Sequence, residues 1–85
     1  DPAAVAHSKP APDIFLAAAE GVGADIRRCI GIEDAAAGVA AIKVAGALPI
    51  GVGKAEDLGN DIALVSGTAE LTYAYLQNVW AQSGR

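Results

Sequence analysis

Three short apolar runs, separated by longer helix-forming stretches, constrain the fold of this chain more than any other feature. Each run has the length of a buried strand, and they lie at 28–32, 47–53 and 62–65. The helix-forming stretches lie at 13–20, 35–46 and 69–81. Because strands that are joined through helices pair in parallel, this order predicts an α/β fold with a parallel sheet and flanking helices.

The remaining segments are predicted as loops, and helical spacing predicts the buried faces. Prolines mark residues 1–12 as an extended lead-in, and residues 54–61 read as a polar loop. Pro49 predicts that the second strand is bent or near an edge, and Gly46 is expected to end the second helix. The side chains expected to face inward are Ile14, Phe15, Ala18, Val39, Ile42, Thr72, Tyr73, Leu76, Val79 and Trp80.

The predicted sheet looks unfinished. Three strands leave at least one central edge without a partner, although parallel sheets are normally covered and paired. The order of elements also begins with a loop and a helix, without a first strand. We therefore expect an incomplete Rossmann-like sheet, in which residues 1–85 form the C-terminal part of a larger core domain.

Composition excludes several classes of function. The 85 residues carry a formal net charge of −4, which argues against a nucleic-acid partner, because phosphate-reading surfaces are normally basic. No apolar run approaches the roughly 20 residues of a membrane span, and a lone cysteine gives no intrachain disulfide. We expect a soluble cytoplasmic protein that makes no contact with membranes.

Two adjacent carboxylates, Glu33 and Asp34, end the first apolar run in CIGIEDAAAG. Asp34 could cap the helix that follows, and taken alone this interpretation is favoured, because Asp is among the best N-cap residues. Alternatively, the pair could bind a divalent cation, since two neighbouring carboxylates repel each other near a buried sheet end. Mg²⁺ is commonly held by one or two carboxylates together with water and phosphate.

A second candidate is Lys9, in the stretch SKPAPDIF. The residue before a proline is restricted to extended conformations, so Pro10 limits where Lys9 can lie. A lysine ammonium is a compact charge suited to a phosphate oxygen. The alternative is a solvated surface lysine, which is the common state of lysines.

Together, SKPAPDIFLAAAEGVG and IGIEDAAAGVAAIKVAGALPIGVG resemble the C-terminal half of the haloacid dehalogenase core domain. In that superfamily the third motif is a lysine in a K-P-x-P-x-x-F context, and the fourth is an acidic pair at the end of the fourth strand. Both motifs occur here in the right order. The segment GALPIGVGKAEDLGNDIALV, followed by LTYAYLQNVW, is similar to the β-phosphoglucomutase branch of that superfamily.

The resemblance implies a role for each matching residue. Lys9 would be catalytic and phosphate-binding, balancing charge on an aspartyl nucleophile and the transferring phosphoryl group. Glu33 and Asp34 would hold Mg²⁺. The implied activity interconverts β-D-glucose 1-phosphate and glucose 6-phosphate through a phospho-aspartate. Two alternatives remain open: a sugar-phosphate phosphatase of the same superfamily, or a non-catalytic α/β domain in which Asp34 is only a helix cap.

One motif of the family, the one that carries its nucleophile, is missing from these residues. The family's nucleophile lies in a D-x-D motif, and no D-x-D occurs in these residues. The resemblance implies that the nucleophile strand and the helical cap domain belong to an N-terminal half that acts as the partner of this chain. We therefore expect the 85 residues alone to be inactive.

Overall fold

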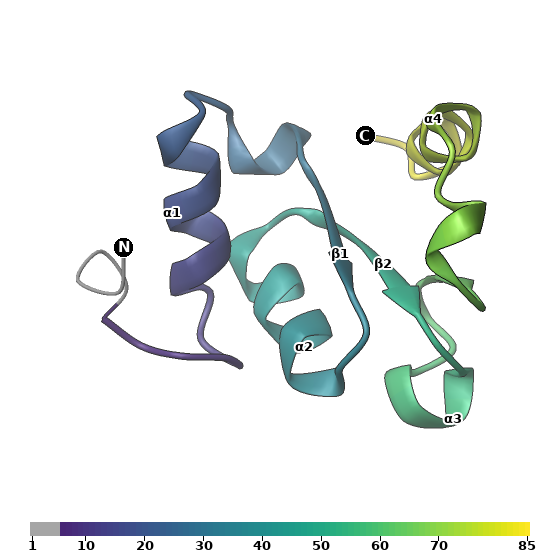
Figure 1. Ribbon diagram of the computed structural model, residues 1–85. Coiled ribbons are helices and arrows are strands. Elements are labelled where there is room, and N and C mark those ends of the chain that lie inside the picture. Colours follow the sequence, from purple (N-terminus) through teal and green to yellow (C-terminus); the bar gives the residue numbers. More distant parts are fainter. Residues whose placement is uncertain (1–5) are drawn as a thin grey trace.

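The structure is a computed structural model that describes residues 6–85, where three parallel strands form one sheet flanked by helices (Figure 1). The strands are β1 (Ile30–Glu33), β2 (Leu48–Val52) and β3 (Ala63–Val65). The α-helices are α1 (Asp13–Gly21), α2 (Ala36–Ala45), α3 (Ala55–Leu58) and α4 (Tyr73–Gln82), with short 3-10 helices η2 (Ile26–Arg28) and η3 (Thr68–Glu70). The predicted α/β class with an open parallel sheet is confirmed. The first part of the predicted lead-in, residues 1–5, lies outside the described residues.

The helices form layers on both sides of the sheet. Figure 1 shows α1 and α2 on one side and α4 on the other. The strand order is β1-β2-β3, with Ile32 of β1 beside Ile50 of β2. Ile50 and Ile42 are fully buried and form the centre of the core. A Cβ on Gly31 would lie 2.7 Å from Ile42 Cγ1, so the glycine lets α2 pack directly on β1.

Helix α2 matches its prediction closely. Val39 and Ile42 face inward, with 3% and 0% of their surface exposed. Gly46 ends the helix in a left-handed conformation with φ of 99°, and its N–H donates to the Ile42 carbonyl. A left-handed residue after the last helical turn favours glycine, because a Cβ is strained there.

The placement of Pro49 near a sheet edge is wrong, since β2 is the central strand. The missing N–H is tolerated for a local reason. Leu48 N donates to the Cys29 carbonyl on the β1 side, and successive residues of a strand direct their N–H groups to opposite sides. Pro49 would therefore direct its N–H toward β3, where pairing begins only at Ile50.

Two predicted segments differ from the structure. Within the predicted polar loop, residues Ala55–Leu58 form α3, and Leu58 is buried against the sheet. The last helix begins at Tyr73 instead of residue 69, because the Thr72 hydroxyl caps it by accepting from Tyr75 N at 3.1 Å. Residues Thr68–Glu70 form the separate η3 turn.

Some predicted inward faces are also wrong. Tyr73, the first residue of α4, is 76% exposed. Ile14 and Ala18 are exposed, and Ala19 is the residue of α1 that is buried. Cys29, expected within the first strand, precedes β1 and donates its thiol to the Asp25 carbonyl at 3.3 Å. Helical spacing thus predicts that α1 exists but not which of its faces is buried.

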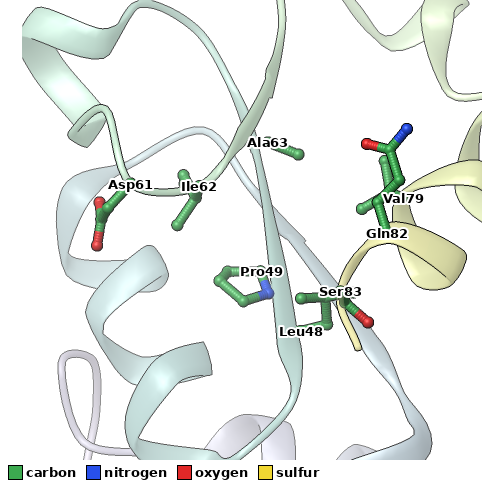
Figure 2. Close-up of a pocket in the computed structure, with 8 residues that line it drawn as sticks. All are labelled: Leu48, Pro49, Asp61, Ile62, Ala63, Val79, Gln82 and Ser83. Carbon is green, nitrogen blue, oxygen red and sulfur yellow. The ribbon is translucent and has the colours of Figure 1, made fainter. Parts of the chain in front are cut away.

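Between α4 and the sheet lies a pocket of about 320 Å³ (Figure 2). It is close to the start of β2, so it lies away from Glu33 at the opposite end of the sheet. Its lining comprises Leu48, Pro49, Asp61, Ile62, Ala63, Val79, Gln82 and Ser83. In residues 6–85 no helix has the length and apolarity needed to cross a membrane.

Candidate functional site

The carboxyl end of β1 carries the acidic pair. Glu33 is the last residue of β1, and Asp34 follows it before α2 begins at Ala36. Functional groups in open α/β sheets gather at this end, in the loops between a strand and the next helix. The fold therefore places the acidic pair where a ligand can be reached.

Lys9 meets this pair although it lies 24 residues earlier in the chain. Its Nζ donates to Glu33 Oε2 at 2.8 Å. The ammonium also lies 5.7 Å from the centre of the Phe15 ring, at the first turn of α1. The structure thus brings together the three predicted site residues, because Asp34 directly follows Glu33.

Contacts of His7 with Asp13 hold the loop that carries Lys9 against the start of α1. Asp13 Oδ2 accepts from the backbone N of His7 at 3.1 Å and lies 3.1 Å from the His7 ring. The His7 contact holds the pKa of Asp13 below its usual value of 3.8. Asp13 and Phe15 are not among the site residues that the sequence predicts. Both positions belong to the K-P-x-P-x-x-F motif, four and six residues after Lys9, and this was the signal that could have identified them.

Glu33 is the more enclosed of the two carboxylates. Only 11% of its side chain is exposed. Its Oε1 accepts from Asp34 N at 3.2 Å, and its Oε2 accepts from Lys9. The Lys9 hydrogen bond is the main cause that holds the pKa of Glu33 below its usual 4.5, against burial, which raises it. The neighbouring Asp34 also lowers this pKa, through its side chain and through the backbone N–H that donates to Glu33 Oε1.

Asp34 does not cap α2, so the interpretation of Asp34 as only a helix cap is wrong. The N-cap residue is Ala35, which has no side chain able to accept a hydrogen bond from the helix. Asp34 lies one residue further out and is exposed. Its carboxylate is therefore free of the structural role that would otherwise explain an acid at this position.

The donor chemistry of Glu33 and Asp34 fits a hard divalent cation. Both supply carboxylate oxygens, which Mg²⁺ prefers. Proteins commonly bind this ion through one or two such groups. Among residues 6–85 no cluster of three or more acidic, histidine or cysteine side chains forms a complete metal cage. The pair can therefore provide part of a Mg²⁺ site, with water or phosphate oxygens among the other ligands.

The other polar groups at this end of the sheet bind each other. Ser66, which follows β3, directs its N and Oγ to Glu70 Oε2 at 2.8 and 2.6 Å. Lys54, which follows β2, is largely exposed and lies 3.9 Å from Glu56. Neither has a contact with Lys9 or the acidic pair, which leaves these three residues as the candidate site.

The chain is similar to known proteins in both sequence and structure. No family model matches the chain. Over 83 residues the chain is 45% identical to β-phosphoglucomutase of Bacillus subtilis, an alignment that covers 96% of this chain and 36% of the relative. The solved β-phosphoglucomutase of Clostridium difficile superposes with a TM-score of 0.91 at 37% identity, over 98% of this chain and 37% of that chain.

A family IA, variant 3 haloacid dehalogenase hydrolase of Entamoeba histolytica superposes with a TM-score of 0.73 at 30% identity, over 86% of this chain and 35% of that chain. The chain thus spans about a third of the length of these relatives.

The fold and these relatives place the chain in the haloacid dehalogenase superfamily, as the motifs predicted. Within that superfamily, it is a homologue of the β-phosphoglucomutases over nearly its whole length.

Proposed function

We propose that this chain supplies the lysine and metal-binding part of a phosphoryl-transfer site. In this proposal residues 1–85 are the C-terminal part of a haloacid dehalogenase-like core, and the nucleophile and cap belong to an N-terminal half. The whole protein interconverts β-D-glucose 1-phosphate and glucose 6-phosphate through a phospho-aspartate, with Mg²⁺ as cofactor. The observation that carries the proposal is the 2.8 Å contact between Lys9 Nζ and Glu33 Oε2, beside Asp34.

The chemistry of phosphoryl transfer explains why these groups belong together. The reaction is mostly positioning and neutralisation of charge on the transferring group. Mg²⁺, when bound, would neutralise phosphate oxygens and orient the nucleophile. Lys9 would bind the phosphoryl group from the other side, and the Glu33 carboxylate would keep the ammonium directed toward the site. Glu33 and Asp34 would hold the cation.

A sugar-phosphate phosphatase of the same superfamily is the second candidate, and the similarity to a family IA hydrolase favours it. The two functions differ in the acceptor, which is a second sugar phosphate in the mutase and water in the phosphatase. The residues of this chain serve both. The products therefore decide between them.

The test is a product assay of the full-length protein with β-D-glucose 1-phosphate and Mg²⁺. Glucose 6-phosphate without stoichiometric inorganic phosphate is the expected result, and inorganic phosphate with free glucose would indicate the phosphatase. Asp34→Asn should lower turnover by about 10²–10³-fold, the usual cost of removing one electrostatic group from such a site.

A matched control for Asp34→Asn is Asp57→Asn, since Asp57 is an exposed acid on α3. This variant should keep full activity. If Asp34→Asn turned over like the wild type with unchanged Mg²⁺ affinity, the assignment of Asp34 as a metal ligand would be wrong.

A further inference from the structure

Gly38 lies beneath the carboxylate of Glu33. It is the third residue of α2, it is buried, and its φ lies outside the left-handed region. A Cβ added at this position would overlap Cγ, Cδ and Oε2 of Glu33, and these are the three nearest atoms. The space that a side chain of residue 38 would fill is thus occupied by the Glu33 carboxylate.

The helix itself gives no reason for a glycine here. Glycine in a helix interior is less favourable than alanine by about 1 kcal/mol, because it loses more backbone entropy. The neighbouring residues of α2 are largely alanine, so the glycine interrupts an otherwise strong helix-forming stretch. Gly31 and Gly51 also avoid close contacts, but the atoms that would meet their Cβ belong to apolar core side chains. Gly38 instead faces a charged group.

The position of Glu33 explains what this space achieves. The oxygen that a Cβ on residue 38 would displace is Oε2, which accepts from Lys9. The other oxygen, Oε1, accepts from Asp34 N. A carboxylate lying across the first turn of α2 therefore faces Lys9 and Asp34 together, and the amino end of the helix favours its negative charge.

We propose that Gly38 is a positioning residue for the candidate site. By leaving the first turn of α2 without a side chain, it sets the direction in which Glu33 presents its carboxylate to Lys9 and to a divalent cation. The metal part of this inference rests on the proposed function, whereas the contact with Lys9 does not.

The test is Gly38→Ala in the full-length protein, with Gly21→Ala as matched control. Gly21 ends α1, and a Cβ there would meet nothing within 4 Å. The first readout is the Lys9 side-chain ammonium signal in ¹⁵N NMR without metal, which should lose its protection from exchange in Gly38→Ala. The second is Mg²⁺ affinity by calorimetry, which should fall about 10–100-fold, the usual cost of removing support from a metal ligand. Gly21→Ala should leave both unchanged.

A double-substitution cycle separates positioning from general damage. In a Glu33→Ala background, Gly38→Ala should change Mg²⁺ affinity less than about 2-fold, because the side chain it displaces is already gone. If Gly38→Ala alone fails to fold but the double variant folds, the shared space is supported. If neither folds, or if the loss of affinity persists without Glu33, the inference is overturned.

The outcomes also distinguish this inference from the proposed function. If the wild type binds no Mg²⁺ while Gly38→Ala still releases Lys9, the proposed function fails and the positioning role holds. An unchanged Lys9 signal in a folded Gly38→Ala variant would overturn the positioning role, whatever the protein catalyses.

Discussion

The positively charged side chains at the two ends of the sheet, Arg85 and Lys9, have different kinds of partner. At the amino end, the Arg85 guanidinium donates to three backbone carbonyls, the shortest contact being 2.8 Å to Gly46. These carbonyls belong to Arg27 of η2, to Gly46, which follows the last residue of α2, and to Ala47, which directly precedes β2. Carbonyls at a helix end lack partners within the helix. At the carboxyl end, Lys9 instead contacts a side chain, Glu33, beside the exposed Asp34.

The difference separates structural from chemical roles. Arg85 ties α4 to the rest of the molecule by satisfying backbone oxygens, which stabilises the fold. The Lys9–Glu33 pair satisfies no backbone group of the strands. Because the Lys9 side chain is 37% exposed, solvent screens the pair and its contribution to stability is small. Substitutions at the amino end should therefore change the free energy of unfolding, and substitutions at the carboxyl end should change activity.

The largest effect is expected for Lys9→Met in the full-length protein. This change keeps most of the apolar stem and removes the ammonium that would neutralise the transferring phosphoryl group. Turnover should fall by at least about 10²-fold, while the urea midpoint shifts little. A steady-state assay and an unfolding curve on the same sample measure both.

The control for this change is Lys54→Met, since Lys54 is an exposed lysine at the same end of the sheet. It should leave turnover within a factor of about two, because its ion pair with Glu56 is a solvent-exposed contact. Comparable losses in both variants would mean that the positive charge of this end, and not Lys9, supports the reaction.

At the amino end, Arg85→Ala should lower the free energy of unfolding by about 1–2 kcal/mol, because charge-assisted hydrogen bonds to backbone carbonyls are lost. Turnover should be unchanged. Arg85→Lys is the matched comparison, since it keeps the charge but loses the planar fork that reaches three carbonyls. A drop in turnover with either variant would break the separation between the two ends.

The smallest effect concerns acid stability. The pKa of Glu33 is below 4.5 in the folded protein because of Lys9, so this pair stabilises the fold above the unfolded value. Its contribution should disappear as the pH falls through the lowered folded pKa. The difference in free energy of unfolding between the wild type and Lys9→Met should therefore be constant above about pH 5 and shrink below it. A difference that grows toward acid pH would contradict the assigned cause.

Local patterns in the sequence predict the elements of this fold but not all of their ends. Short apolar runs and helical spacing suffice for the three strands and for α1, α2 and α4, but they miss the short helix α3. The start of α4 at Tyr73 depends on the Thr72 cap. Tyr73 itself is exposed, although helical spacing predicts that it faces inward. A proline is tolerated at position 49 of the central strand because β3 begins to pair only at Ile50. This pairing involves residues more than ten positions further along the chain.

The candidate site follows the same division. The motifs predict Lys9, Glu33 and Asp34 individually, because each lies in a recognisable local context. Their contact depends on how the loop before α1 returns to β1, and no local pattern encodes that path. The sequence of α2 does not predict a role for Gly38 either, because the atoms that fill the space beside it belong to Glu33, outside the helix.

The cation assignment is tested most directly by a crystal of the full-length protein soaked in Mn²⁺ as a stand-in for Mg²⁺. We predict an anomalous peak bonded to oxygens of both Glu33 and Asp34, near the roughly 2.0–2.1 Å typical of Mg²⁺ and its oxygen ligands. A peak elsewhere in an active protein, with Lys9 and Glu33 still paired and Asp34 facing solvent, would contradict the account.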